Sequence, residues 1–268
     1  MRRLGLMIST VIALVVGSGS AAEPVGEERV EIKHRLVRPD KVEAGKRYPL
    51  VIYLHGAGQK GSDNEKPMNS ALVKLLGTAE VRAAFPCFVL VPQCPAGERA
   101  DGRAMNWTNW KGQKENKAPM WVEADAEASP PLRAAMRVLD EVVKAEPIDA
   151  DRVYLTGTSM GGSGSWNWAA RDPARFAAVI PVCGLSDATM GAKIKGVPVW
   201  TFHGGEDAQV PVERTRKMVE AIRAAGGDVK YTEMAGQGHG IDGKVWTREV
   251  LGWMFGRVRG SKATDTNR

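Results

Sequence analysis

The sequence has few cysteines, few histidines and no long apolar run. Only three cysteines, Cys87, Cys94 and Cys183, occur among 268 residues, and an odd number leaves at least one thiol unpaired. Cys87 and Cys94 flank one strand-like run, which would separate their Cα atoms by roughly 23 Å against the ~5.5 Å of a disulfide. A Cys94–Cys183 bridge would need their two strands to be neighbours. We therefore expect buried free thiols and no structural disulfide.

No run of about 18 apolar residues, the length of a membrane-spanning helix, occurs in the chain. The shorter apolar run Leu4 to Val16 follows Arg2 and Arg3, and small residues occupy positions 17–22. A charged start, a short apolar centre and a small-residue end are typical of a secretory signal peptide. The sequence thus predicts a signal peptide over residues 1–22, a secreted or periplasmic protein, and no membrane attachment after cleavage.

The sequence also lacks a large cluster of charges of one sign. The formal net charge is +6, and acidic and basic residues are interleaved along the helix-like stretches. A basic cluster occurs only over Arg257 to Lys262, where it is typical of a loose terminus rather than a nucleic-acid surface. We expect no nucleic-acid partner. With 43% apolar residues and no internal repeat, the chain predicts one domain over residues 23–260 and a loose tail over 261–268.

Strand-like and helix-like segments alternate along most of the chain. Predicted strands cover 30–37, 49–54, 87–91, 152–156, 177–182, 197–202 and 229–234; predicted helices cover 71–85, 130–144, 160–171, 212–225 and 244–255. This alternation predicts an α/β fold with a mostly parallel central sheet and helices on both faces. Catalytic groups in such sheets lie beyond the carboxyl ends of the strands.

Residues 157–161 read Gly-Thr-Ser-Met-Gly, a Gly-x-Ser-x-Gly pattern between a predicted strand and a predicted helix. A nucleophilic serine on a tight strand-to-helix turn leaves little room for side chains two residues before and after it, which favours glycine there. This context predicts that Ser159 is the nucleophile of an α/β-hydrolase fold. The alternative is a glycine-rich helix start at which the serine only caps the helix.

An oxyanion hole is expected beside such a serine. The helix that starts at Met160 directs backbone N–H groups and positive potential at a developing oxyanion. The second donor is expected from the loop after the strand 49–54, where small residues let the backbone approach a substrate. Either Ala57 or Gly58 can supply that N–H, and the sequence does not choose between them. The alternative for this loop is a plain glycine turn.

The chain contains four histidines from which a base can be drawn. His34 lies within the first predicted strand, whereas His55 and His203 each end a predicted strand and are followed by glycine. The chain order of this architecture is serine, acid, histidine, and only His203 and His239 follow Ser159. Because His203 comes too early to leave a convincing acid before it, His239 is the predicted base.

The base needs an acid that holds its ring in the correct tautomer. Asp207 follows the predicted strand 197–202 within a His-Gly-Gly-Glu-Asp segment. The alternatives are Glu206, its neighbour, and Asp187, which follows the preceding strand. Position after the strand favours Asp207.

Six segments come in an order that resembles a known group of enzymes. They are Leu54–Gly58, Pro92–Pro95, Gly157–Gly162, Pro181–Gly184, Phe202–Asp207 with Val210-Pro211, and Gly238-His239. Together they resemble the small secreted α/β-hydrolase esterases, namely the polyhydroxybutyrate-depolymerase-like and feruloyl-esterase-like proteins often grouped as prolyl-oligopeptidase-like. The resemblance spans about residues 45–256.

The resemblance implies a function and a site. It implies a serine carboxylic-ester hydrolase that forms an acyl-enzyme on small or carbohydrate-linked esters of the feruloyl or acetyl type. The triad would be Ser159, Asp207 and His239, with no metal and no cofactor. The oligomeric state is not implied.

Two features depart from the expected pattern. Ser163 stands where an aromatic residue commonly follows the glycines, which would widen the substrate pocket. The non-periodic stretch 95–128 is long for a loop and holds Trp107, Trp110 and Trp121 among polar residues. These tryptophans would form a platform for an aromatic acyl group or a sugar ring; the alternative is that they pack the loop onto the domain.

Two other functions compete with the esterase. A prolyl-oligopeptidase-like peptidase is disfavoured because the chain has no long N-terminal segment to form the propeller that gates those enzymes. A non-catalytic carbohydrate-binding protein on the same fold is disfavoured because every triad position is filled. Covalent labelling by a fluorophosphonate would distinguish an active serine from an inert one, which the fold alone cannot do.

Overall fold

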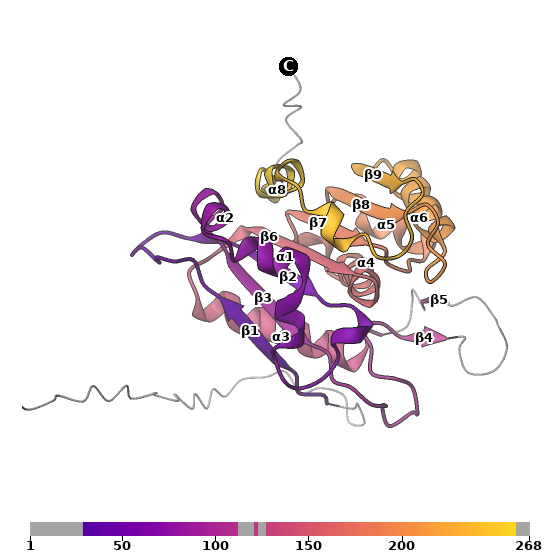
Figure 1. Cartoon of the computed structure of the whole chain (residues 1–268), viewed down its shortest axis with the longest axis horizontal. Helices are drawn as coiled ribbons and strands as arrows, with labels where there is room; N and C mark the ends of the chain where they lie inside the picture. Colours follow the sequence, from indigo (N-terminus) through magenta and orange to yellow (C-terminus); the bar gives the residue numbers. More distant parts are fainter. Residues whose placement is uncertain (1–28, 112–120, 123–126, 261–268) are drawn as a thin grey trace, which may run out of the picture.

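The computed structural model describes residues 29–111, 121–122 and 127–260 (Figure 1). The predicted signal peptide over 1–22 and the predicted tail over 261–268 lie outside the described residues. Within the described part, no helix has both the length and the apolar character that a membrane crossing requires.

Seven strands form the central sheet, in the order β1-β3-β2-β6-β7-β8-β9 (Figure 1). Their bounds are β1 Lys33–Val37, β2 Tyr48–Leu54, β3 Phe88–Gln93, β6 Ile148–Thr158, β7 Ala178–Val182, β8 Val199–Gly204 and β9 Val229–Met234. β1 pairs antiparallel with β3, and every other neighbouring pair is parallel. The predicted α/β-hydrolase fold with a mostly parallel sheet is thus confirmed.

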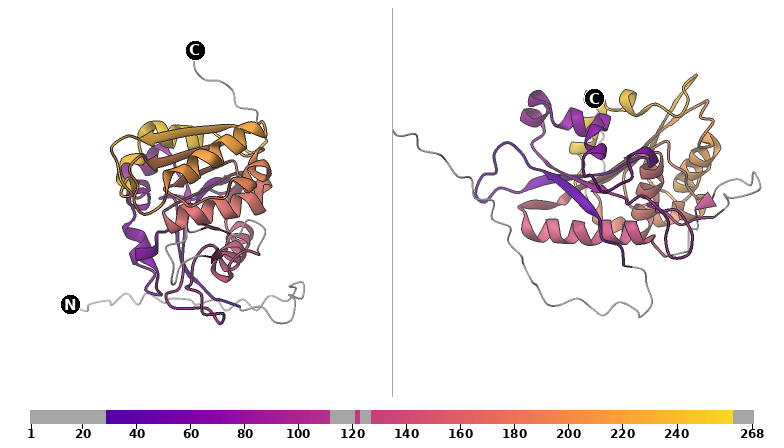
Figure 2. Two further views of the ribbon diagram at one scale, coloured as in Figure 1. Left: turned by 90° about the vertical axis from the view of Figure 1, so that its right-hand side faces the viewer. Right: turned by 60° about the horizontal axis from the view of Figure 1, so that its bottom comes forward.

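Helices cover both faces of the sheet, which lies between two helix layers (Figure 2). One face carries α3 Pro130–Ala145, α4 Met160–Arg171, α5 Gly191–Ile194 and α6 Val212–Ala224. The other face carries α1 Ala71–Leu76, α2 Ala79–Ala84, α7 Asp242–Val245 and α8 Arg248–Phe255. Short 3₁₀ turns occur at Ala57–Gln59, Lys66–Asn69, Pro173–Arg175 and Ala188–Met190.

The strands are apolar on both sides because both sides are covered. In β2, Leu50, Ile52 and Leu54 join the core under α3 and α4, whereas Val51 and Tyr53 join the core under α1 and α8. Successive side chains of a strand point to opposite faces, so a strand buried on both faces reads as a continuous apolar run. This is the pattern by which the sequence predicted the inner strands.

Two predicted helices are each interrupted. The helix expected over 71–85 is split at Gly77, whose N–H bonds carbonyls of the preceding turn, and α2 begins after Thr78. The helix expected over 244–255 is split before Thr247, whose side chain accepts from the N–H of Val250 and caps α8 (3.3 Å). Apolar spacing alone did not reveal these breaks, because both halves of each pair pack apolar residues against the same core cluster.

The loop predicted over 95–128 contains a two-stranded antiparallel ribbon, β4 Trp110–Lys111 with β5 Trp121–Val122. In Figure 1 this ribbon lies beyond the sheet at the side of β7, β8 and α4. Strands of two residues carry too little pattern to be recognised from sequence.

The three cysteines are buried and free, which confirms the predicted absence of a disulfide. The predicted looseness of the basic cluster is wrong for its first residues. The hydroxyl of Tyr154 donates to the carbonyl of Arg257 (2.8 Å), and the guanidinium of Arg259 pairs with Asp151 (2.6 Å). Residues 257–260 are therefore tied to the domain.

Candidate active site

Ser159 lies on the turn between β6 and α4. Its backbone has φ 58° and ψ −117°, a conformation that costs energy for any residue with a side chain. A Cβ atom at Gly161 would lie 1.8 Å from the carbonyl oxygen of Leu54, and one at Gly157 would lie 2.5 Å from the same atom. The end of β2 therefore packs against the turn so closely that both flanking positions require glycine.

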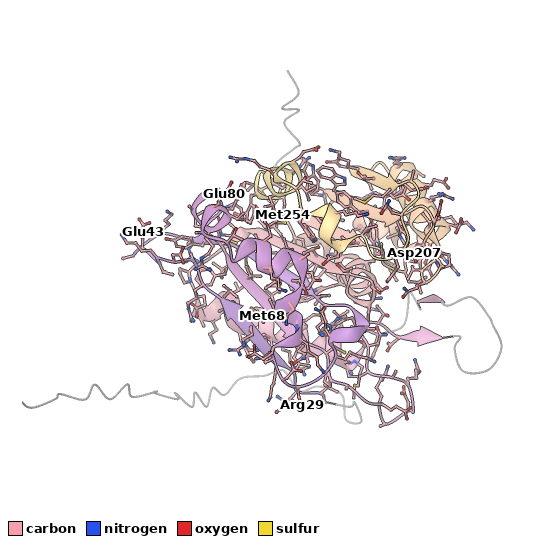
Figure 3. All side chains as sticks on the ribbon, viewed as in Figure 1. Arg29, Glu43, Met68, Glu80, Asp207 and Met254 are labelled. Atoms are coloured by element: carbon pink, nitrogen blue, oxygen red, sulfur yellow. The ribbon has the colours of Figure 1, made fainter. Side chains whose placement is uncertain are left out.

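Three side chains from three loops form one hydrogen-bonded chain at this turn. The Ser159 hydroxyl donates to Nε2 of His239 (2.8 Å), and Nδ1–H of His239 donates to Oδ2 of Asp207 (2.7 Å). These residues follow β6, β9 and β8, so they meet at the carboxyl edge of the sheet. Figure 3 shows Asp207 at the opposite end of the molecule from Glu43 and Glu80.

The two alternatives for the acid lie elsewhere. Glu206 is exposed. The Asp187 carboxylate accepts from the backbone N–H (2.9 Å) and the hydroxyl (2.8 Å) of Thr189, so it caps its own turn. Neither contacts His239 among the described interactions.

The Asp207 carboxylate is buried but well supplied with donors. Its Oδ1 accepts from the N–H groups of Gln209 (2.8 Å) and Val210 (2.9 Å). Burial by itself raises the pKa of this carboxyl, but these two bonds and the contact with His239 outweigh burial and hold the pKa below its ordinary value. A carboxylate that stays ionised can orient the imidazole and stabilise its protonated form.

His55 fixes the backbone of the loop after β2. Its Nε2 accepts from the N–H of Cys94 (2.9 Å), so the proton of the neutral ring is on Nδ1, which donates to the carbonyl of Gly56 (2.7 Å). Burial lowers the pKa of His55 to about 4, which keeps the ring neutral near pH 7. Because the described peptides are trans, the N–H of Ala57 points away from the ring.

The loop after β2 and the start of α4 are close neighbours. A Cβ at Gly56 would lie 3.8 Å from Cβ of Ser159. Met160 is the first residue of α4, and the N–H of a first helical residue has no acceptor within the helix. The arrangement can thus present two backbone donors beside the serine hydroxyl.

Trp107 does not have the role expected of it. Its side chain is fully buried at 0% exposure, and its indole N–H donates to the carbonyl of His55 (3.1 Å). A Cβ at Gly164 would lie 2.6 Å from Cβ of Trp107, so the tryptophan packs closely on α4. Trp107 therefore fastens its loop onto the domain and offers no face to a substrate.

Trp110 and Trp121 lie on the ribbon β4–β5, where Trp110 is opposite Val122 and Trp121 is opposite Lys111. Their side chains lie outside the described part of the structure. Their predicted contact with a substrate stays a prediction.

Ser163 is buried on α4. Its hydroxyl donates to the carbonyl of Ser159 (3.2 Å) and accepts from the N–H of Leu185 (2.8 Å), so the side chain joins α4 to the segment after β7. Its predicted effect on the width of a substrate pocket stays a prediction.

A cavity that the sequence did not predict borders the turn. It has a volume of about 490 Å³, and its lining includes Gly56 and Thr158, the neighbours of Ser159 in space and in sequence. The rest of its lining comes from Tyr53, Gln59, Asn69, Ser70, Ala71, Lys74 and Asp242. The segment before α1 carries no recognisable motif, so nothing in the sequence connected it to the site.

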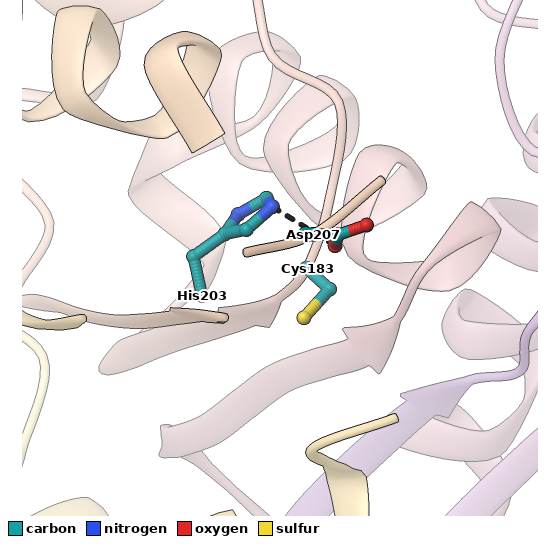
Figure 4. A group of neighbouring side chains, drawn as sticks. All are labelled: Cys183, His203 and Asp207. Atoms are coloured by element: carbon teal, nitrogen blue, oxygen red, sulfur yellow. Dashed lines mark ion pairs between the residues drawn. The ribbon is translucent and has the colours of Figure 1, made fainter. Parts of the chain in front are cut away.

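Cys183, His203 and Asp207 form the one cluster, among the described residues, with metal-ligand atoms within 4.8 Å of one another (Figure 4). The cluster does not fit a metal ion. Nε2 of His203 lies 3.0 Å from the carbonyl oxygen of Val210 and 3.2 Å from Oδ2 of Asp207, and both oxygens are acceptors. That nitrogen must carry a proton, so it has no lone pair for a metal.

Comparisons with known proteins agree with this fold. A family model described as the dienelactone hydrolase family matches residues 88–244. A solved thermostable esterase is 32% identical with a TM-score of 0.71, covering 86% of this chain and 60% of that chain. Esterase PE8 shares the fold with a TM-score of 0.59 at 20% identity, covering 85% of this chain and 97% of that chain.

Among curated sequences, a protein described as an uncharacterized secreted protein of Arthroderma benhamiae is 24% identical. The match covers 80% of this chain and 24% of the relative. The chain spans 24%, 59% and 53% of the lengths of the first three curated relatives that it matches.

Proposed function

The chain belongs to the dienelactone hydrolase family, and we propose that it is a carboxylic-ester hydrolase whose nucleophile is Ser159. The observation that carries the proposal is the hydrogen-bonded chain from Ser159 through His239 to Asp207, with separations of 2.8 Å and 2.7 Å. A serine hydroxyl is a weak nucleophile unless a positioned base takes its proton, and the base in turn needs an orienting acid. The three residues supply these roles.

The proposed reaction is acyl transfer in two steps. The Ser159 oxygen attacks the ester carbonyl while Nε2 of His239 accepts the hydroxyl proton. The tetrahedral intermediate collapses, His239 protonates the departing alkoxide, and an acyl-enzyme remains on Ser159. Water then attacks the acyl carbonyl, His239 accepts a proton from the water, and the carboxylic acid leaves as the serine hydroxyl is restored.

The proposed oxyanion donors are the N–H groups of Met160 and Ala57. The His55 ring supports the choice of Ala57 over Gly58, because it holds the Gly56 carbonyl and thereby turns the Ala57 N–H to the opposite side. Donors that are already oriented need no rearrangement when charge develops, which is the largest single contribution in many acyl-transfer enzymes.

The proposed substrates are small or carbohydrate-linked esters of the feruloyl or acetyl type, as in the polyhydroxybutyrate-depolymerase-like and feruloyl-esterase-like proteins. The cavity beside Gly56 and Thr158 supports a polar alcohol group, because Asn69 and Lys74 line it. Trp110 and Trp121 remain the proposed contacts for an aromatic acyl group. A lactone, the substrate class in the family's name, also belongs among the candidates.

Export is part of the proposal. We assign residues 1–22 to a signal peptide, 23–260 to the catalytic domain and 261–268 to a tail, with secretion or a periplasmic location. The match to a relative described as secreted supports this assignment.

The test is hydrolysis of an ester panel by the protein from residue 23 onward and by Ser159→Ala. The panel holds p-nitrophenyl acetate and butyrate, methyl ferulate, acetylated xylan, a dienelactone and a prolyl peptide amide. We expect ester turnover that Ser159→Ala abolishes, and fluorophosphonate labelling that mass spectrometry maps to Ser159. Ser165→Ala is the matched control, because Ser165 is a buried serine of the same helix whose hydroxyl donates to the carbonyl of Gly161 (2.9 Å).

Three outcomes would contradict the proposal. Full turnover by Ser159→Ala would exclude Ser159 as the nucleophile. Absence of both turnover and labelling in the unmodified protein would favour a non-catalytic binding protein. Turnover of the prolyl amide in preference to every ester would favour a peptidase.

A further inference from the structure

A second imidazole lies against the acid of the site. His203 is the last residue but one of β8 and is fully buried, and its Nε2 lies 3.2 Å from Oδ2 of Asp207 (Figure 4). The same Oδ2 accepts from Nδ1–H of His239 at 2.7 Å. One carboxylate oxygen is therefore held between two imidazoles, of which only His239 contacts Ser159.

The protonation state of His203 follows from its neighbours. The carbonyl of Val210 (3.0 Å) and the Asp207 carboxylate can only accept, so the Nε2 that faces them carries the proton. Nδ1 faces the hydroxyl of Thr215 at 2.8 Å, and a hydroxyl can donate to it. Burial lowers the pKa of His203, so the ring is neutral and Nδ1 is an acceptor.

His203 closes the loop that carries the acid. Oδ1 of Asp207 is held by the N–H groups of Gln209 and Val210, while the ring of His203 binds both Oδ2 and the carbonyl of Val210. Thr215, buried on α6, holds the other side of the ring. Neither the aspartate nor its loop can rotate without breaking contacts to this ring.

We propose that His203 is a positioning residue for the reaction, an Nε2–H donor that orients the Asp207 carboxylate and disperses part of its charge away from His239. This inference rests on the proposed function, because it assigns Asp207 the role of the acid. His203 itself takes no proton from the substrate.

The other titratable groups around this cluster do not replace His203 as the donor to Asp207. Burial, and then the nearby Asp207 charge, raise the pKa of the Cys183 thiol to about 12, so the thiol is uncharged. Hydrogen bonds from Arg216 and Tyr231 lower the pKa of Glu233 to about 2, so Glu233 stays an ion paired with Arg216 (2.6 Å). The carboxylate of Asp242 has other partners: its Oδ1 accepts from Thr158 (2.6 Å) and Trp246 (3.1 Å).

The first experiment compares His203→Leu with His203→Gln. Leucine fills the space without a donor, whereas a glutamine amide can offer an N–H near the Nε2 position. For His203→Leu we expect kcat to fall about tenfold to a hundredfold with KM nearly unchanged, because an Asp207 carboxylate that has lost its contact with His203 no longer holds the His239 ring in one orientation. We expect His203→Gln to restore most of kcat.

The pH profile separates positioning from simple loss of structure. Without the His203 donor, more of the Asp207 charge acts on the protonated ring of His239 and stabilises it. The acid limb of kcat/KM, which reports protonation of the base, should therefore move to higher pH in His203→Leu. Thr201→Val is the control: it removes a buried hydrogen bond from the same strand, to the carbonyl of Pro181 (2.9 Å), without touching Asp207. It should lower stability and leave kcat and the acid limb unchanged.

A measurement on the unmodified protein guards against variants that do not fold. Nitrogen-15 NMR of the histidine rings should find that the His203 ring is the neutral Nε2–H tautomer between about pH 7 and pH 9. An Nδ1–H tautomer or a cationic ring at His203 in that range would overturn the inference.

The failure of this inference differs from failure of the proposed function. If the unmodified protein neither hydrolyses esters nor labels with a fluorophosphonate, the proposed function fails first. If it does both, but folded His203→Leu keeps full kcat and the original acid limb, the role of His203 alone is wrong. Equal losses in His203→Leu, His203→Gln and Thr201→Val would likewise reduce His203 to a structural residue.

Discussion

The carboxyl ends of β2 and β8 share a buried His-Gly pair, yet the two pairs support charges of opposite sign: the proposed oxyanion near β2 and the protonated ring of His239 near β8. A fully buried histidine followed by glycine stands at the carboxyl end of each strand: His55 directly follows β2, and His203 is the last residue but one of β8. The ring of His55 carries its proton on Nδ1 and holds the carbonyl of Gly56, which leaves the Ala57 N–H free for the proposed oxyanion. The ring of His203 carries its proton on Nε2 and donates to a carboxylate that supports a positive charge. The same two residues serve either task, because the acceptors around the ring decide which nitrogen is protonated.

The largest expected effect comes from removing the charge on the β8 side. Asp207→Asn keeps the volume of the side chain but presents an amide to His239, which favours the wrong tautomer. We expect kcat to fall by about 10⁴, the typical cost of holding the base of a serine triad in the wrong tautomer. Steady-state kinetics on p-nitrophenyl acetate measures it, with circular dichroism to verify folding. A loss below tenfold would remove Asp207 from the mechanism.

The next largest effect is expected from a change in the loop after β2. His55→Leu removes the donor to the carbonyl of Gly56, so the Ala57 N–H is no longer held in place. Loss of one oxyanion donor typically costs about 10² to 10³ in kcat, and we expect a value in that range with KM little changed. If His55→Leu folds and raises KM without lowering kcat, the loop binds the ground state instead.

The free energy of unfolding should depend on pH through the two buried histidines, His55 and His203. In the unfolded chain His55 takes up a proton below about pH 6.5, whereas in the folded protein it does so only near pH 4. Unfolding therefore takes up protons in this window, and stability falls as the pH drops through it. The expected loss is about 3 kcal/mol for His55, with a further loss in the same direction from His203, whose pKa is also lowered by burial.

Urea unfolding at several pH values between about 4 and 7 measures this slope. His55→Gln cannot titrate, so its stability should vary less with pH than that of the unmodified protein. An equal slope in both proteins would mean that His55 is protonated within the fold.

The smallest effect is expected from the contact by which Trp107 holds the loop after β2. Trp107→Phe keeps an aromatic ring on α4 but loses the N–H that donates to the carbonyl of His55. We expect a loss of about 1 kcal/mol in stability and only a few-fold fall in kcat/KM. Thermal unfolding and the same ester assay measure both; a loss of kcat as large as that of His55→Leu would place Trp107 in the mechanism itself.

The sequence predicted the parts of this molecule that obey short-range rules. The glycines around Ser159 are visible because the close approach of Leu54 excludes any side chain there. The inner strands are visible because both of their faces are buried. Asp207 and His239 follow from their places after strands together with the chain order of this architecture.

What the sequence did not predict depends on contacts between distant segments. Nothing local shows whether Trp107 faces solvent or α4, since its partners His55 and Gly164 come from other elements. The hydroxyl of Ser163 is occupied by Leu185 for the same reason. The one available signal for the two positioning rings was the repeated His-Gly at a strand end, and its meaning depends on protonation that only the surrounding acceptors reveal.

The buried thiols have a consequence for how the protein can be made. Cys87, Cys94 and Cys183 are all free, and burial raises the pKa of each thiol to about 12. Thiols in that state exchange and oxidise slowly. Folding then depends on no oxidant and no disulfide isomerase, so the protein should fold equally well in a reducing cytoplasm and in an oxidising exterior, and a reductant in the refolding buffer should change nothing.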